Sequence, residues 1–274
     1  MATIASWSDK LNVIAKTAKD KFLAKLGIMS VSTKKGVVLG TGWGNHVVLE
    51  KHVPFWELDP IFQTLEGIHG HARRIGIATI AGTHVVVLSG RIHMYEQNPD
   101  ALYVLMRMLW ELGVRELVLT NAVGGMRKSV CKGDIIVVNS VIKNGPSPLV
   151  DARFTDPNSL LKQDLIRRIW ITSPINAVHI GGIVVNSGPE FESPEDRQFI
   201  DRPVVLGVGM SPYADMVCWR YFADTGTDDD RAAAHAIVIS CCSNSISDTH
   251  GHKSNVDVMN ASANRLASML KHIF

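Results

Sequence analysis

Short apolar runs rich in β-branched residues alternate with helical patterns along most of this 274-residue chain. Each run is bounded by glycine or another turn-forming residue and has the length of a buried strand. Strands that alternate with helices predict an α/β fold with a mixed, twisted central β-sheet flanked by helices on both faces. We expect strands at residues 37–39, 75–80, 84–88, 116–119, 135–138, 180–185 and 236–239.

Helices are predicted where apolar residues recur every three or four positions. The first such stripe covers residues 4–26, and the clearest one covers residues 100–112, with an acidic residue near its start. Further helical patterns span residues 158–170, 193–200, 212–222 and 254–273. Two irregular stretches remain, the proline-rich residues 143–157 and the acidic residues 224–231. The acidic stretch is typical of a solvated surface loop.

The composition indicates one ordinary globular unit. No internal repeat and no Pro-, Gly- or Ser-rich linker divides the chain, so we expect a single domain over residues 1–274. The formal net charge is +2 without a block of Lys and Arg, which argues against a nucleic-acid partner and favours a small ligand. No signal peptide and no stretch of roughly 20 apolar residues is present, so we expect no membrane association and a cytoplasmic protein.

Neither cysteines nor histidines predict a metal site. Cys131, Cys218, Cys241 and Cys242 form no CxxC pair, which argues against a disulfide framework and a zinc ribbon. Alternate spacing gives no consistent tetrahedral ligand set among the remaining candidates, which are His69, His71, Asp248, His250 and His252. We therefore expect no metal.

Glycine-rich or polar segments follow several predicted strands, which is where open α/β sheets place their ligands. The segment GVVLGTGWGN, residues 36–45, runs into a turn that could expose backbone N–H groups to an anion. A purely structural turn fits this segment equally well. It is no dinucleotide fingerprint, because Gly40, Gly42 and Gly44 give G-x-G-x-G and no acidic residue follows a second strand at the expected distance.

The segment SGRIHMYEQ, residues 89–97, places Arg91, His93, Tyr95 and Glu96 just after a strong strand. Strand alternation sends Arg91 and His93 to the same side, so a guanidinium and an imidazole could converge on one oxyanion. A less specific alternative is that both side chains cap a surface loop.

The segment VVNSGPEFESPEDR, residues 184–197, places Phe191 and Glu192 between a strand and a helix. An aromatic face beside a carboxylate suits a flat heterocycle that donates an N–H. Ser193 and Asp196 indicate a helix cap in the same segment, and the two interpretations are compatible.

Three further strand ends carry small polar residues. LVLTNAVGGM, residues 117–126, combines Asn121 with a glycine pair and by itself predicts a loop. VLGVGMSPYADM, residues 205–216, places Met210 and Ser211 at a glycine-rich strand end before a helix, and VISCCSNSISD, residues 238–248, ends a strand near Asn244. So many polar strand ends are hard to explain as unrelated loops, which favours one shared site.

The motifs LGTGWG, GHA, GRIHMYE, TNAVGG, GDI, GPEFES, VGMS and the Asn244 segment occur in this order along nearly the whole chain. In order and spacing they resemble the trimeric purine nucleoside phosphorylase family, which includes methylthioadenosine phosphorylase. The resemblance implies a nucleoside phosphorylase-like fold and a homotrimer. It also implies reversible phosphorolysis of a purine nucleoside, with inorganic phosphate as co-substrate and no cofactor.

The resemblance also assigns residues. It places phosphate against Thr41, Arg91, His93, Asn121, Ala122 and Ser211. It places the nucleoside against His71, Tyr95, Phe191, Glu192, Met210, Asn244 and Asn255, the last where many members have a His. The catalytic residues by this similarity are Asn244, Glu192 and His93.

Base preference follows from two of these residues. Members that favour 6-oxopurines resemble this chain in having Asn at position 244, whereas the 6-aminopurine branch has Asp there. Glu192 points the same way, because a carboxylate matches the N1–H of hypoxanthine or guanine and repels the N1 lone pair of adenine. We therefore expect inosine and guanosine, or their deoxy forms, as substrates.

Two alternatives stay open. One is a methylthioadenosine or other 6-aminopurine nucleoside phosphorylase. The other is a non-catalytic nucleoside-binding protein on the same scaffold, although a pure binder has little reason to keep a residue that stabilises a transition state.

Overall fold

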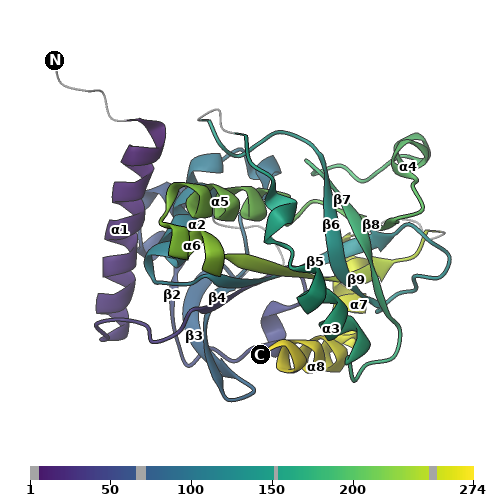
Figure 1. Cartoon of the computed structure of the whole chain (residues 1–274), viewed down its shortest axis with the longest axis horizontal. Coiled ribbons are helices and arrows are strands. Elements are labelled where there is room, and N and C mark those ends of the chain that lie inside the picture. The colour runs from purple at the N-terminus through teal and green to yellow at the C-terminus, as the bar shows by residue number, and fades with distance from the viewer. Residues whose placement is uncertain (1–5, 66–71, 151–153, 247–251) are drawn as a thin grey trace.

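A mixed β-sheet is the centre of this protein (Figure 1). The computed structural model describes residues 6–65, 72–150, 154–246 and 252–274, without the side chains at positions 45, 64, 65, 252–256 and 263. Nine strands follow the order β2-β3-β4-β1-β5-β8-β7-β6-β9 in the described chain. Their bounds are β1 Lys35–Leu39, β2 Lys51–Pro54, β3 Arg74–Ile80, β4 Thr83–Ser89, β5 Glu116–Gly125, β6 Ile135–Asn144, β7 Val178–Asn186, β8 Val205–Gly209 and β9 His235–Asn244.

Strand β5 joins two parts of the sheet. On one side it runs parallel to β1, which is parallel to β4, and β3 and β2 then continue antiparallel to the edge. On the other side it pairs with both β8 and β9, and β7 and β6 complete a closed ring back to β9. The predicted mixed sheet is confirmed, and every predicted strand lies within an observed one.

Helices cover the sheet on both faces, as predicted (Figure 1). Helix α1 packs on α2 and α2 packs on α5, while α3 packs on β6 and β7, and α7 packs on β9. The helix bounds are α1 Trp7–Leu26, α2 Pro99–Glu111, α3 Gln163–Ile171, α4 Pro194–Ile200, α5 Tyr213–Thr225, α6 Asp228–Ala233, α7 His252–Ala261 and α8 Ala263–Ile273. Helix α1 begins at Trp7 because Ser6 and Asp9 form a capping box, and Ile4 lies outside the described residues.

The sheet differs from the sequence prediction in β2 and β5. Strand β2 was not expected; it lies at the sheet edge, where Pro54 can do without a backbone N–H. The loop predicted within residues 117–126 is wrong, because β5 continues to Gly125. The backbone of residues 120–124 pairs with β9, and this pairing outweighs the turn preference of Asn and Gly.

The acidic residues 224–231 also differ from the prediction of a surface loop. They end α5 and form most of α6, so that prediction is wrong. Thr227 accepts a hydrogen bond from the Asp230 backbone, and the Asp230 carboxylate accepts one from the Thr227 backbone. Asp230 also pairs with Arg115 at 2.8 Å, which fixes the short helix to the sheet.

Two predicted helices are interrupted. Residues 158–170 form a 3-10 turn, Pro157–Leu160, and then α3, because the Leu161 backbone is extended and bridges to Ala236. Residues 254–273 form α7 and α8, with Ser262 buried between them and its hydroxyl donating to the Val258 carbonyl.

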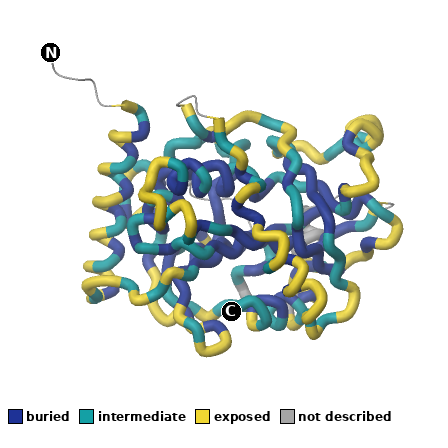
Figure 2. Tube along the Cα trace, in the orientation of Figure 1, coloured by how far each residue is buried: buried dark blue, intermediate teal, exposed yellow. Residues whose placement is uncertain are grey.

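Buried residues are concentrated in the middle of the molecule (Figure 2) and come from the strands and from the helices that cover them. The inner strands are buried along most of their length, as expected for strands covered by helices on both faces. Among the helices within the described ranges, none combines the length and the apolar character needed to span a membrane.

Candidate active site

Residues at or beyond the ends of several strands surround one cavity of about 340 Å³. Thr41 follows β1, His93 and Tyr95 follow β4, and Met210 and Ser211 follow β8. The polar strand ends therefore do converge on one site. The cavity is lined by Thr41, His93, Tyr95, Asn121, Ala122, Val123, Gly124, Pro189, Phe191, Glu192, Val208, Gly209, Met210, Ser211, Ser243 and Asn244.

Three predicted site residues are not in this lining. Arg91 lies behind Ser211, as described below. His71 lies outside the described residues, and the Asn255 side chain is not described. The histidine and aspartate side chains considered for a metal site, at positions 69, 71, 248, 250 and 252, are likewise outside the description.

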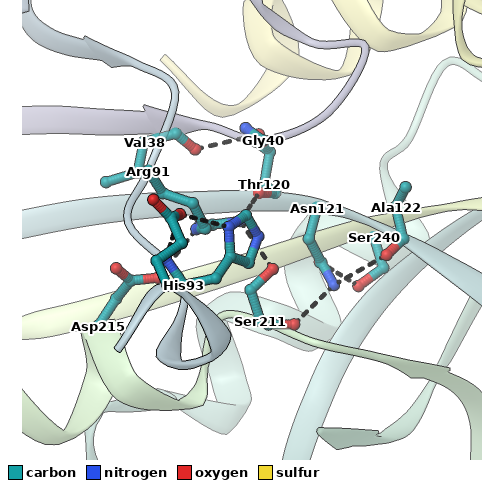
Figure 3. A network of polar contacts seen from close by, with 11 residues as sticks. Val38, Gly40, Arg91, His93, Thr120, Asn121, Ala122, Ser211, Asp215 and Ser240 are labelled. Carbon is teal, nitrogen blue, oxygen red and sulfur yellow. Dashed lines mark hydrogen bonds and ion pairs between the residues drawn. The ribbon is translucent and has the colours of Figure 1, made fainter. Parts of the chain in front are cut away.

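The Arg91 guanidinium is buried and reaches three groups (Figure 3). Its Nη1 donates to the Thr120 carbonyl at 2.7 Å and to Ser211 Oγ at 3.0 Å. Its Nε donates to Asp215 at 3.1 Å. Its Nη2 has no hydrogen-bond partner among the described residues. Arg91 therefore lies one layer behind the wall that carries Ser211, with one buried donor left for a ligand.

Gly40 makes this position of Arg91 possible. A Cβ at position 40 would lie 2.4 Å from the Thr120 carbonyl oxygen and 3.0 Å from Arg91 Nη1. The Gly40 backbone instead donates to Thr120 Oγ1 at 3.0 Å, and Thr120 donates to the Val38 carbonyl (Figure 3). The glycine-rich turn thus serves close packing of β1, β5 and Arg91.

Asn121 orders the Ser211 backbone. Its Nδ2 donates to the Ser211 carbonyl at 2.8 Å, and its Oδ1 accepts from Ser240 Oγ at 2.7 Å (Figure 3). The sequence analysis did not find Ser240 or Asp215. Each is a polar residue within an apolar stretch of strand or helix, and that pattern was the available signal. The structure buries both side chains.

His93 lines the cavity with its ring stacked on Tyr95, the ring centroids lying 4.7 Å apart. Glu96 accepts hydrogen bonds from the His93 backbone N–H at 2.8 Å and from Nδ1 at 3.3 Å. Burial lowers the pKa of His93, although the hydrogen bond to Glu96 opposes this shift. The imidazole is therefore neutral at neutral pH. Because an ionised Glu96 carboxylate can only accept, we assign the ring proton to Nδ1, which leaves a lone pair on Nε2.

Glu96 and Tyr95 have opposite pKa shifts. Burial alone would raise the pKa of Glu96, but hydrogen bonds from His93 and Arg73 outweigh burial and lower it. Burial and the nearby Glu96 charge raise the pKa of Tyr95 to about 12, so its hydroxyl stays protonated. Arg73, whose Nη2 lies 2.7 Å from Glu96, was not found from the sequence because 23 residues separate the two.

Phe191, Glu192 and Asn244 form a second set of lining residues. Asn186 donates to Glu192 Oε1 at 2.5 Å and so orients its carboxylate. The predicted helix cap is confirmed: Ser193 and Asp196 form a capping box, and α4 begins directly after Glu192. The cap fixes where α4 begins and therefore holds the backbone just before it, which carries the Glu192 carboxylate.

Asn244 owes its position to an irregularity in the β5–β9 ladder. Val123 pairs with Cys242, but Gly124 pairs with Asn244, so Ser243 is an extra residue in β9. A Cβ at position 124 would lie 3.3 Å from Asn244 Nδ2, so glycine leaves room for the amide. Ser243 Oγ donates to Asn244 Oδ1 at 3.1 Å and sets the orientation of the amide.

Tyr95 and Met210 also line the cavity, and both side chains pack close to Gly188. Gly188 has a φ of 71°, and a Cβ there would lie 2.5 Å from Met210 Sδ and 2.8 Å from Tyr95 Cδ1. One set of groups at the cavity combines hydroxyl, imidazole and nearby guanidinium groups, which suit a small anion, and is called the anion-binding end. The set of Phe191, Glu192 and Asn244 combines an aromatic ring, a carboxylate and an amide, which suit a planar nitrogen heterocycle, and is called the heterocycle-binding end.

Comparisons with known proteins agree with this architecture. The family described as the phosphorylase superfamily matches residues 34–274. Purine nucleoside phosphorylase 1 of Geobacillus stearothermophilus is 28% identical over 249 residues, covering 84% of this chain and 82% of that protein. Purine nucleoside phosphorylase of Mycobacterium leprae is 29% identical over 248 residues, covering 86% and 87%.

Solved structures share the fold. Isoform 2 of purine nucleoside phosphorylase from Schistosoma mansoni, in complex with cytosine and ribose-1-phosphate, has a TM-score of 0.80 at 21% identity. The match covers 100% of this chain and 98% of that one. A Schistosoma purine nucleoside phosphorylase in complex with hypoxanthine has a TM-score of 0.77 at 23% identity, with 95% of each chain covered.

Proposed function

Because this chain belongs to the phosphorylase superfamily, we propose that it catalyses the reversible phosphorolysis of 6-oxopurine nucleosides such as inosine and guanosine. It is a pentosyltransferase of the nucleoside phosphorylase type. The observation that carries the finer assignment is that one cavity is lined by both the anion-binding end and the heterocycle-binding end, together with Tyr95 and Met210. Such an arrangement holds both substrates of one group transfer in contact.

Phosphate binds at the end formed by Thr41, His93 and Ser211. The unpartnered Arg91 Nη2 supplies a charge-assisted donor from behind Ser211. Asn121 holds the Ser211 backbone, and Ala122 lines the adjoining wall. The Nε2 lone pair of neutral His93 accepts the O–H of hydrogen phosphate, which leaves a phosphate oxygen to attack the sugar.

The nucleoside occupies the rest of the cavity, with ribose near Tyr95 and Met210 and the base against Phe191. In the reaction a phosphate oxygen bonds to the anomeric carbon, the glycosidic C–N bond breaks, and its electron pair stays on the purine. The leaving base finally takes up the proton that hydrogen phosphate gives up, so hydrogen phosphate and nucleoside give free base and ribose 1-phosphate. The oxocarbenium-like transition state is stabilised by the adjacent phosphate anion.

Glu192 and Asn244 favour a 6-oxopurine. Glu192 accepts the N1–H of hypoxanthine or guanine, which adenine lacks. The Asn244 amide donates to the purine N7 as negative charge reaches the base. The Ser243 hydroxyl supports this role. It donates to Asn244 Oδ1 and thereby fixes the other end of the amide as the Nδ2 donor.

The resemblance to a trimeric family further supports a homotrimer in the cytoplasm, with phosphate as co-substrate and no cofactor. His71 and Asn255 complete the nucleoside site in this proposal. The whole chain, residues 1–274, acts as one phosphorylase domain.

Release of free base tests the proposal, with inosine, adenosine and methylthioadenosine assayed separately with and without inorganic phosphate. We expect phosphate-dependent release from inosine and much less from adenosine, with Asn244→Ala abolishing most of it. A preference for either aminopurine nucleoside would keep the phosphorylase and reject the base assignment. Nucleoside binding without any turnover would instead identify a binding protein. Light scattering after size-exclusion chromatography tests the trimer.

A further inference from the structure

Arg73 has three features that oppose folding. Its backbone φ is 47°, in the left-handed region that disfavours side chains. Its guanidinium is buried, with the residue 2% exposed. Its Nε and Nη1 have no hydrogen-bond partner within the described part of the chain. A buried cation in a disfavoured backbone conformation persists where its surroundings require it, and such residues cluster at functional sites.

The surroundings of Arg73 lead directly to the cavity. Its Nη2 lies 2.7 Å from Glu96 Oε2, and both side chains are 3% exposed. The other carboxylate oxygen, Oε1, accepts from the His93 backbone N–H and from His93 Nδ1. Glu96 thus uses one oxygen for Arg73 and the other for His93, which lines the anion-binding end.

Buried charges near this end balance in pairs. Asp215 pairs with Arg91 at 3.1 Å, and Glu96 pairs with Arg73 at 2.7 Å. With neutral His93, the two pairs carry no net charge. Without Arg73, the Glu96 carboxylate would leave one uncompensated negative charge behind His93, and this charge would repel a phosphate anion.

We propose that Arg73 is a positioning residue for phosphate: it neutralises Glu96 and holds the Glu96 carboxylate against His93, so that the anion can bind beside the imidazole. This inference rests on the proposed phosphorolysis. Arg73 acts through Glu96, since it does not line the cavity itself.

Removing Arg73 makes the strength of phosphate binding depend on the protonation of Glu96 and therefore on pH. The charged and titratable groups around Glu96 and its partner His93 are Arg73, Tyr95, Arg91 and Asp215. In Arg73→Gln the burial of Glu96 is less opposed, so its pKa rises. Glu96 in this variant is protonated at low pH and harmless to phosphate binding, and it ionises and repels phosphate as the pH increases.

The test compares the phosphate KM of the wild type, Arg73→Gln and Arg73→Gln/Glu96→Gln at two pH values. At about pH 8 we expect the single variant to have a phosphate KM roughly tenfold above the wild type, and at about pH 6 a clearly smaller ratio. The double variant keeps an amide oxygen for His93 and removes the charge, so its phosphate KM returns to within about threefold of the wild type. The inosine KM changes little in either variant.

Two further variants separate this effect from misfolding. Arg73→Gly removes the side chain where the left-handed backbone favours glycine, and it should show the same phosphate defect. Arg115→Gln breaks another arginine–carboxylate pair, with Asp230 on α6, and should leave the phosphate KM unchanged. Titration calorimetry with inorganic phosphate alone gives the same ranking without turnover.

The outcomes distinguish the two proposals. A wild type that releases no base with phosphate rejects phosphorolysis itself. An active wild type with an unchanged phosphate KM in Arg73→Gln at both pH values overturns the role of Arg73. A double variant as defective as the single one also overturns it, because packing and not charge would then be responsible.

Discussion

Asp215 Oδ2 accepts the Nε–H of Arg91 at 3.1 Å, with side chains that are 5% and 2% exposed. Asp215 lies on α5 and Arg91 follows β4, so the pair ties a helix to the strand end that reaches the cavity. Burial raises the pKa of Asp215, and the Arg91 charge opposes that shift.

Asp215→Ala leaves the Arg91 guanidinium buried without its counter-charge, so the free energy of unfolding should fall by about 3 to 5 kcal/mol. Urea denaturation followed by tryptophan fluorescence measures this. Asp224→Ala is the matched control, because Asp224 pairs with Arg220 at a more exposed position on α5 and should cost about 1 kcal/mol or less. Equal losses in both variants would contradict the special position of Asp215.

Asn244→Asp should change base preference. The carboxylate accepts from the 6-amino group of adenine and repels the O6 of hypoxanthine, so the inosine-to-adenosine ratio of kcat/KM should fall roughly 10- to 100-fold. Steady-state assays with the two nucleosides measure the ratio. Ser243→Ala, which removes the hydroxyl that contacts Asn244 Oδ1 and the Val123 carbonyl, should lower inosine turnover with a smaller change in the ratio. An unchanged ratio in Asn244→Asp would remove Asn244 from base recognition.

Gly188→Ala and Gly82→Ala form a second matched pair. Both glycines have positive φ, 71° and 79°, so each alanine should cost about 1 kcal/mol of unfolding free energy. Only position 188 is crowded by Met210 and Tyr95, whereas a Cβ at position 82 meets nothing within 4 Å. Gly188→Ala should therefore raise the nucleoside KM and Gly82→Ala should not. Unchanged kinetics in both would show that Met210 and Tyr95 do not contact the nucleoside.

His93 should make stability depend on pH. Its folded-state pKa lies below the unfolded value, so between these two values the unfolded chain binds more protons. Stability is therefore lost as the pH falls from about 6.5, the unfolded pKa, towards the folded pKa. Relative to the wild type, His93→Gln should be less destabilising at about pH 5.5 than at about pH 7.5 in urea denaturation. The opposite trend would mean that the folded protein stabilises a charged imidazole.

Local sequence patterns predicted the strands well and the ends of helices less well. The strand cores are apolar runs covered on both faces, so burial and β-propensity agree there. At Asn121 the local preference and the strand pairing disagree. Turn chemistry favours a loop, yet pairing with β9 extends β5 to Gly125. Thr227 and Asp230 show the reverse case, in which a capping box within a charge run was overlooked.

The candidate site was predictable for those residues that lie within a recognisable motif and line the cavity themselves. Thr41, His93, Glu192 and Asn244 reach the cavity from separate strand ends, as the sheet architecture requires. The depth of Arg91 was not predictable, because it depends on Gly40, Thr120 and Ser211 from three other segments. Arg73 was missed for the same reason: only the folded chain brings it to Glu96.

The extra residue in β9 determines which side chain lies opposite Gly124. In an unbroken β5–β9 ladder, Gly124 would face Ser243, and the amide of Asn244 would turn to the opposite surface of the sheet. Deleting Ser243 would remove the bulge and still leave the asparagine opposite Gly124, whereas inserting a residue after Ser243 would shift the register of the residues that follow. The place of the Asn244 amide is therefore set by an extra residue in β9 as well as by the asparagine itself.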